Sequence, residues 1–160
     1  MIKDSGERRE FETGAVRDIQ KGKGRCDLMP LDVASFLLAN YPFKQRDTVI
    51  AEIAAFVFNG NTNHLETALS SFSKSAFKNT ADMLLEVSIH FEEGANKYGE
   101  MNWQKGLPAN CYIDSAVRHY LKYLRGDEDE RHDRAFVWNL MCCIWTCEHK
   151  PELNAYKKDD

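Results

Sequence analysis

The chain has 160 residues, a length most simply explained by one domain with its own hydrophobic core. Hydrophobic residues make up 43% and charged residues 29% of the sequence, as in ordinary soluble globular proteins. The formal net charge of −4 argues against a nucleic-acid-binding protein, because such proteins usually carry a basic domain or patch. No apolar run approaches the roughly 20 residues that cross a bilayer, and the charged start of the chain is unlike a signal peptide. We therefore expect a cytoplasmic protein with neither membrane nor nucleic acid as partner.

Residues 1–30 contain many charges and few apolar side chains, so we predict a loosely ordered N-terminal arm. The stretch 21–25 alternates cations with glycines and contains Lys23 and Arg25. Glycines let backbone amides approach an anion closely, so this stretch is a candidate phosphate-binding segment. A solvated linker is the alternative interpretation. The stretch is not a Walker motif, because it lacks that motif's spacing and its following Ser or Thr.

Six segments between residues 31 and 150 combine helical spacing of apolar residues with residues that favour helix ends. The predicted helices span about 31–39, 48–59, 81–97, 110–125 and 130–149, and a weaker one begins near Asn63 and contains Leu65, Leu69 and Phe72. Residues 40–42 end the first of them, and 151–160 form a C-terminal tail. Hardly any stretch alternates with the period of two that a strand requires. The predicted fold class is all-α, a bundle of about six helices.

The cysteines do not indicate a disulfide framework or a zinc ribbon. There are five of them, an odd number, and no Cys-x-x-Cys pair occurs. Cys143 and Cys147 lie one helical turn apart in an apolar run. We predict that both are reduced thiols in the core.

Two adjacent glutamates near the end of the fourth predicted helix are candidate metal ligands. Glu92 and Glu93 are separated by about 100° on a helix, so one of them should face the protein and the other solvent. Glu92 lies closer to the predicted buried stripe of Val87 and Phe91, whereas Glu93 has the spacing of an ion pair with Lys97. The functional interpretation is that both carboxylates bind Mg²⁺, which prefers oxygen ligands.

The last two predicted helices carry further polar residues. Asp114 and Arg118 share one helix face and alone would be an ordinary intrahelical pair, and His119 lies between that face and the apolar side. In the next helix His132 and Asn139 fall on one stripe, and a buried Asn139 would need partners from another helix or from a ligand. Trp103, in the loop between the fourth and fifth helices, is either a surface for stacking a base or an anchor for the loop.

Several motifs, taken in order, resemble a known family. They are residues 13–18, 22–30, 92–99, 102–103, 105–106, 114–119 and 138–139, which include Thr13-Gly14-Ala15-Val16-Arg17-Asp18 and Asn102-Trp103. This series resembles the phage dATP/dGTP diphosphohydrolase N-terminal domain family, which looks related to the MazG-like and MazZ-like all-α pyrophosphohydrolases. Relative to shorter members, residues 44–79 look like an insertion into a nucleotide pyrophosphohydrolase-like domain of residues 31–150.

The resemblance implies a Mg²⁺-dependent (or Mn²⁺-dependent) enzyme that cleaves a purine deoxynucleoside triphosphate to its monophosphate and pyrophosphate. It would work in the host cytoplasm if phage-encoded, and as a homo-oligomer, since Tyr120, Tyr123 and Trp145 are hard to bury in one small bundle. The expected catalytic residues are Glu92, Glu93, Asp114 and His119; the expected metal ligands are Glu92, Glu93, Asp114 and His132; and the expected substrate-binding residues are Lys23, Arg25, Lys97, Asn102, Trp103, Lys105, Arg118 and Asn139.

Two other functions fit some of the same residues. His132 and Asp133 form a literal His-Asp doublet, which would suit an HD-type phosphohydrolase with a transition metal. A protein that binds and sequesters nucleotide without turnover would use the same cations and aromatic rings and need no metal. The products separate these alternatives: pyrophosphate for the first function, inorganic phosphate or tripolyphosphate for the second, and unchanged nucleotide for the third.

Overall fold

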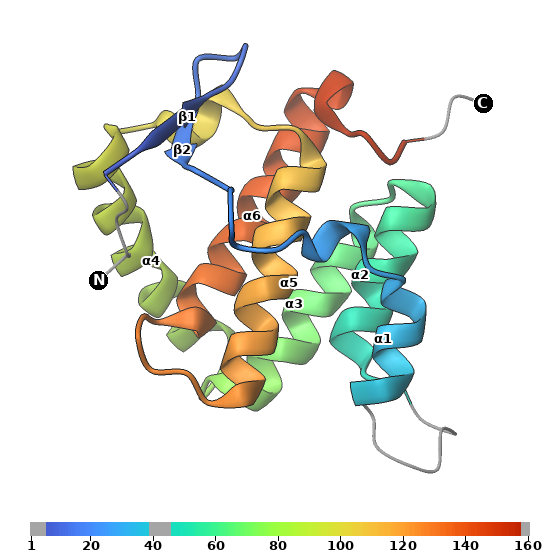
Figure 1. Cartoon of the computed structure of the whole chain (residues 1–160). Helices are drawn as coiled ribbons and strands as arrows, with labels where there is room; N and C mark the ends of the chain where they lie inside the picture. Colours follow the sequence, from blue (N-terminus) through green and yellow to red (C-terminus); the bar gives the residue numbers. More distant parts are fainter. Residues whose placement is uncertain (1–5, 39–45, 158–160) are drawn as a thin grey trace.

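The computed structural model describes residues 6–38 and 46–157, and within them the chain forms six α-helices and one small β-hairpin (Figure 1). The helices are α1 (Leu31–Leu38), α2 (Thr48–Asn59), α3 (Asn63–Ala76), α4 (Thr80–Tyr98), α5 (Ala109–Arg125) and α6 (His132–His149). There are also three short 3-10 helices: η1 (Cys26–Leu28) precedes α1, η2 (Asn102–Lys105) lies between α4 and α5, and η3 (Pro151–Leu153) follows α6. The predicted all-α bundle is therefore confirmed. The predicted end of the first helix, at residues 40–42, lies outside the described residues.

Side-chain and glycine caps set the ends of α2. Asp47 accepts a hydrogen bond from the backbone amide of Ile50 at 2.8 Å, as expected of an N-cap aspartate. Gly60 ends the helix in the left-handed region at a φ of 71°, where a Cβ atom would also meet the backbone of Lys157 at 2.6 Å. The same aspartate accepts from the hydroxyl of Tyr120 at 2.6 Å, so the cap also ties α2 to α5.

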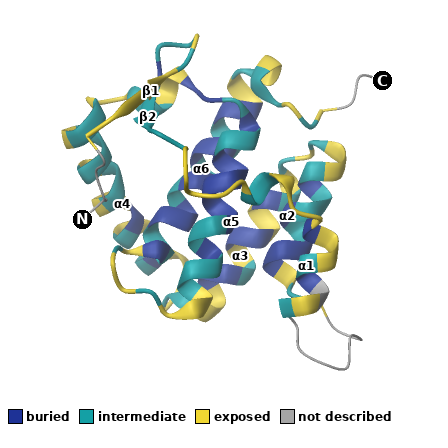
Figure 2. Cartoon of the chain, viewed as in Figure 1, coloured by how far each residue is buried: buried dark blue, intermediate teal, exposed yellow. Residues whose placement is uncertain are grey.

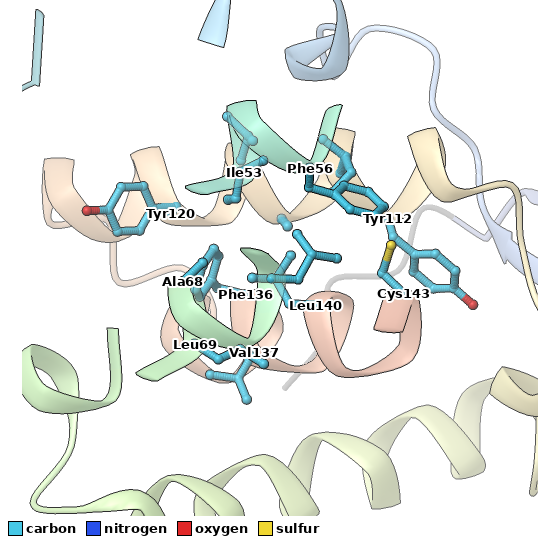
Figure 3. Close-up of a cluster of buried hydrophobic side chains, with 14 of the residues drawn as sticks. Ile53, Phe56, Ala68, Leu69, Tyr112, Tyr120, Phe136, Val137, Leu140 and Cys143 are labelled. Atoms are coloured by element: carbon cyan, nitrogen blue, oxygen red, sulfur yellow. The ribbon is translucent and has the colours of Figure 1, made fainter. Parts of the chain in front are cut away.

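The core lies between α5, α6 and the pair formed by α2 and α3 (Figure 3). Figure 2 shows that buried residues concentrate on α5 and α6, which pack along each other in the middle of the molecule. Ile53 and Phe56 of α2 and Leu65 and Phe72 of α3 are almost fully buried. The described part of residues 44–79 thus contributes two helices to the common core.

The aromatic residues offered as a reason for oligomerisation do not support it. Tyr120 is only 5% exposed, and its ring packs edge-on against Phe72 with centroids 5.8 Å apart. Tyr123 packs against the same ring at 5.2 Å, and Trp145 against Trp103 at 5.1 Å. That argument was wrong, because α3 and η2 supply partners within one chain.

The cysteines of α6 lie in the hydrophobic core. Cys142, Cys143 and Cys147 are buried as free thiols on α6, as predicted for the last two. Burial raises the pKa of the Cys143 thiol well above its ordinary value.

Among the helices of the described chain, none combines the length and the hydropathy that crossing a bilayer requires.

The N-terminal segment is more ordered than the sequence indicated. Strands β1 (Arg8–Glu10) and β2 (Val16–Asp18) pair antiparallel, with Arg9 opposite Arg17. After β2 the chain crosses the face of α5 and reaches η1 and α1 (Figure 1). The prediction of a loose arm failed because its contacts come from residues about 90 positions away in the sequence, which local composition does not reveal.

Candidate functional site

A cleft of about 720 Å³ opens between the N-terminal segment and α5. Its walls come from β1, β2, residues 19–25, the end of α4 and one face of α5. Its lining contains six cationic side chains (Arg9, Arg17, Lys23, Arg25, Arg118 and Lys122) and three carboxylates (Asp18, Asp114 and Glu130). The cleft is therefore a positively charged cavity large enough for a nucleotide.

The β-hairpin is docked by residues of η2 and its flanks. The Asn102 side-chain amide pairs with both backbone groups of Val16: Oδ1 accepts from its amide and Nδ2 donates to its carbonyl, each at 3.1 Å. Lys105 Nζ donates to the carbonyl of Gly14 at 3.3 Å, and the Thr13 hydroxyl donates to the carbonyl of Gly106 at 2.6 Å. Asn102 and Lys105, predicted to bind substrate, are thus occupied in holding the hairpin.

Docking the hairpin places Arg17 in the lining of the cleft. Its Nη1 and Nη2 atoms each donate to Asn139 Oδ1 at 3.2 Å, and Nη2 also donates to the Ser115 hydroxyl at 3.4 Å. The guanidinium lies 5.4 Å from the ring centroid of Trp138. Asn139 is 1% exposed and donates its own Nδ2 to the Ala135 carbonyl at 2.8 Å, so its amide ties β2 to α6.

Asp114 and Arg118 hold the glycine-containing stretch across α5. The buried Asp114 carboxylate accepts from Arg118 Nη2 at 2.5 Å and from the backbone amide of Cys26 at 2.6 Å. Arg118 Nη1 donates to the carbonyls of Lys23 at 3.2 Å and of Gly24 at 3.0 Å. Because this arginine and this amide occupy both carboxylate oxygens, Asp114 acts here as a structural anchor.

The cations of that stretch are exposed at the rim of the cleft. Lys23 pairs with Asp18 at 2.8 Å, and Arg25 pairs with Asp27 through two hydrogen bonds of 2.7 and 2.5 Å. Burial of Asp27 acts to raise its pKa, but the hydrogen bond from Arg25 prevails and the pKa is lowered. The candidate phosphate-binding segment therefore presents its side chains to the cleft, partly neutralised by neighbouring carboxylates.

Two histidines and a glutamate meet where α5 faces the start of α6. His119 Nδ1 lies 2.9 Å from His132 Nδ1 and 3.5 Å from Glu130 Oε1. His132 Nδ1 lies 3.7 Å from the same glutamate oxygen, and His132 Nε2 lies 2.8 Å from Asp129 Oδ1. Burial, followed by the neighbouring His132, lowers the pKa of His119 well below its ordinary value. A neutral His119 is a suitable metal ligand, whereas so low a pKa makes it a weak general base.

Asp133, the second member of the His-Asp doublet, points elsewhere. Its carboxylate accepts from Arg131 at 3.0 and 2.7 Å and from the backbone amide of Arg134 at 2.9 Å. The doublet expected of an HD-type site therefore does not act as one unit in this structure.

The two glutamates of α4 are oriented opposite to the prediction. Glu92 is exposed, whereas Glu93 is half-buried and close enough to His90 to influence its titration. Met83 and Val87 are the buried residues of α4, and His90 and Gly94 continue their stripe into a cavity of about 70 Å³. The inward-facing stripe of α4 thus passes through His90 and not through Phe91, the position predicted for it. This shift of one residue turns Glu92 outward.

The predicted metal ligands do not come together, and of the four only His132 belongs to a group of potential ligands among the described residues. In the described ranges, two groups have three ligand atoms mutually within 4.8 Å: His119, Glu130 and His132, and also Asp127, Asp129 and His132. Glu92, Glu93 and Asp114 belong to neither of these groups. Glu92 instead lines a separate groove of about 290 Å³ at the end of α4.

Two other predicted substrate-binding residues lie outside the cleft lining. Trp103 packs between Phe91 and Trp145, with ring centroids 5.8 and 5.1 Å away, so its ring anchors η2 to the bundle. Lys97 Nζ lies 5.1 Å from the ring centroid of Tyr98. Of the two, only Trp103 lines the small cavity, beside Asn102 and Asn139.

The sequence interpretation missed Arg9, Arg17 and Glu130 as site residues. Arg17 lies within the quoted motif of residues 13–18, and that motif was the one available signal for it. Glu130 was assigned to the helix dipole, because four acidic residues stand together at 127–130 and their sequence does not distinguish them.

The comparison with protein families matches the segment that contains most of α3 and the whole of α4, α5 and α6. The model of the dATP/dGTP diphosphohydrolase N-terminal domain matches residues 66–156, which include η2, Asp114, His119, Glu130, His132 and Asn139. No curated protein and no solved structure matches the chain. Since the matched segment covers more than half of the 160 residues, the chain belongs to the dATP/dGTP diphosphohydrolase N-terminal domain family.

Proposed function

We propose that the protein is a nucleoside triphosphate pyrophosphohydrolase that cleaves dATP-like or dGTP-like purine nucleotides to the monophosphate and pyrophosphate. The cationic cleft is the proposed substrate site. The observation that carries this proposal is Arg17, whose half-buried guanidinium lines the cleft and is hydrogen-bonded to neutral side chains of Asn139 and Ser115. Among the described residues it has no carboxylate at ion-pair distance. A partly buried charge of this kind is stabilised by an anion, and a phosphate suits the planar guanidinium.

Charge complementarity supports a triphosphate as the anion. The three carboxylates of the cleft offset half of its six cations, and a triphosphate carries about four negative charges. Arg9 also lines the cleft, on β1 opposite Arg17 of β2. In the part of the chain that is described, it likewise has no carboxylate partner. Charge-assisted hydrogen bonds from these two arginines would fix the phosphates, while Lys23 and Arg25 at the rim would attract them.

Aromatic side chains of the same cleft suit a nucleobase. Phe11 and Tyr98 line it, and the Arg9 guanidinium lies 4.4 Å from the ring centroid of Phe11. Stacking on an aromatic ring holds any purine and contributes about 1–3 kcal/mol per base. Phe11 and Tyr98 therefore replace Trp103 as the proposed stacking surface.

We further propose that hydrolysis depends on a divalent ion, Mg²⁺ or Mn²⁺. Such an ion would reduce the repulsion between substrate and carboxylates and activate the attacking water. An oxygen-only site made of Glu92, Glu93 and Asp114 does not fit, because Asp114 is bound to Arg118 and Glu92 faces another groove.

Binding of an analogue tests the substrate site directly. The titrant is an α,β-methylene analogue of dATP or dGTP, whose bridging carbon prevents cleavage. Arg17→Gln should weaken binding at least about tenfold, as expected for loss of a charge-assisted hydrogen bond to phosphate. The control is Arg125→Gln, since Arg125 is exposed, lies at the end of α5 and is bound to Asp127. Equal affinity of Arg17→Gln and wild type, with unchanged circular dichroism, would exclude this cleft as the site.

A further inference from the structure

We propose that His119, Glu130 and His132 form a three-ligand site for a divalent transition-metal ion, positioned by Asp129, in the wall of the cationic cleft. This proposal rests on the proposed function in one respect only, namely that the bound ion would assist hydrolysis of the nucleotide. Binding of the ion itself requires no nucleotide. The three ligands come from the second half of α5, the loop after it and the start of α6.

The ligand atoms have the mutual spacing of atoms around one ion. His119 Nδ1, His132 Nδ1 and Glu130 Oε1 form a triangle with sides of 2.9, 3.5 and 3.7 Å. Nitrogen and oxygen ligands lie about 2.0–2.2 Å from a zinc-like ion, so two ligands of one ion lie roughly 3–3.6 Å apart. The ion therefore requires only small side-chain adjustments at this site.

Asp129 orients His132 for this role. A carboxylate only accepts hydrogen bonds, so the 2.8 Å contact to Asp129 Oδ1 places the ring proton of neutral His132 on Nε2. The Nδ1 lone pair then points toward His119 and Glu130. His132 is 2% exposed, which holds its ring in place. A carboxylate behind a histidine ligand is the usual second layer of a metal site.

The alternative acidic group nearby is already neutralised. Asp127 receives two hydrogen bonds from Arg125, one of 2.7 Å from Nε and one from Nη2. Asp129 Oδ2 lies 3.7 Å from Lys122 Nζ. Of the two groups around His132, the one with His119 and Glu130 thus offers the better ligands.

The donor set selects the class of ion. Two imidazole nitrogens and one carboxylate favour Mn²⁺, Co²⁺ or Zn²⁺, whereas Mg²⁺ prefers oxygen ligands alone. His119 and Glu130 also line the cleft, so the coordination positions left by three protein ligands would face the nucleotide site. With an ion bound, His119 takes its Nε2–H tautomer and the contact between the two Nδ1 atoms is replaced by coordination.

The test is titration of tag-free, metal-stripped protein with Co²⁺, followed by visible absorption and calorimetry in the absence of nucleotide. Wild type should bind one equivalent with a ligand-field spectrum, and excess Mg²⁺ should not displace it. Glu130→Gln and His119→Gln should each weaken binding at least about tenfold, and Asp129→Asn should weaken it and alter the spectrum. His64→Gln is the matched control, because His64 lies on α3 and pairs with Glu52 at 2.7 Å.

Absence of saturable Co²⁺ binding by wild type would overturn the proposal. Unchanged affinity and spectrum in both Glu130→Gln and His119→Gln would also overturn it. Co²⁺ binding as expected, without hydrolysis of any nucleotide, would leave the metal site standing and refute the proposed function. Hydrolysis of nucleotide by a protein that binds no Co²⁺ would support the proposed function and refute the metal site.

Discussion

Asp114 and Arg118 form an ion pair on α5, with Oδ2 and Nη2 2.5 Å apart, and both side chains also bind the backbone of residues 23–26. The pair therefore links the middle of the bundle to the stretch that carries Lys23 and Arg25. Its two side chains are only 5% and 16% exposed, so the charges depend on each other more than a surface pair would.

Asp114→Asn should lower the free energy of unfolding by about 2–4 kcal/mol, because it leaves the Arg118 charge partly buried without its carboxylate. Urea denaturation followed by circular dichroism measures this change. Asp127→Asn, which alters the exposed pair with Arg125, should leave stability nearly unchanged. Similar small effects of both variants would mean that Asp114 does not anchor the loop.

Asn102→Ala should loosen the β-hairpin while leaving the helices folded. The substitution removes both hydrogen bonds to Val16 and should cost about 1–3 kcal/mol locally. Amide hydrogen exchange should accelerate in residues 8–18, and nucleotide should bind more weakly because Arg17 is no longer fixed. Gln104→Ala, an exposed position in the same 3-10 helix, is the control. Unchanged exchange in the hairpin would contradict the docking role of Asn102.

The stability of the metal-free protein should fall as the pH decreases from about 6.5 to 4. Burial lowers the pKa of His90 to about 4, and Glu93 only partly offsets that effect. The unfolded chain takes up a proton near the ordinary value of about 6.5, whereas the folded protein stays neutral until about pH 4. This contribution is fully present above pH 6.5 and changes by at most about 1.4 kcal/mol per pH unit.

His90→Phe should therefore reduce the slope of stability against pH in that range, measured by urea denaturation at several pH values. Some slope should remain, since the pKa of the largely buried His119 is shifted in the same direction. A slope identical to that of wild type would show that His90 does not titrate in this manner.

We expect the protein to be a homo-oligomer, on grounds that differ from the aromatic argument. The outer side of α4 exposes Leu84, Leu85 and Ile89, which are 46%, 70% and 38% exposed. Burying this stripe against a second copy would remove apolar surface from water. Sedimentation at micromolar concentration should show a species larger than 18.4 kDa. Leu85→Glu should shift it toward the monomer, and a wild type that sediments only as a monomer would contradict the expectation.

The sequence predicted the helices because their signals are local. Asp47 and Gly60 lie at the two ends of α2 as expected, and the spacing of apolar residues identified α5 and α6. The hairpin was missed because three-residue strands carry too little periodicity, and because Asn102 and Lys105 supply its stabilising contacts from afar.

The site was predicted less well than the fold, for a related reason. Most polar residues of the motifs were found, but a motif does not reveal which atom each side chain binds. Asp114, Arg118 and Asn139 hold the N-terminal segment in place, and Arg17, supported by Asn139, presents its charge to the cleft. On α4 an error of one residue in the buried stripe was enough to reverse the orientation of Glu92.

The most direct test of the central claim is product analysis after incubation of the wild-type protein with dATP and dGTP, with Mn²⁺, with Mg²⁺ and without either. The proposed function predicts dAMP or dGMP and an equal amount of pyrophosphate, formed only when a divalent ion is present. Release of inorganic phosphate or tripolyphosphate, or recovery of the unchanged nucleotide under all conditions, would contradict it.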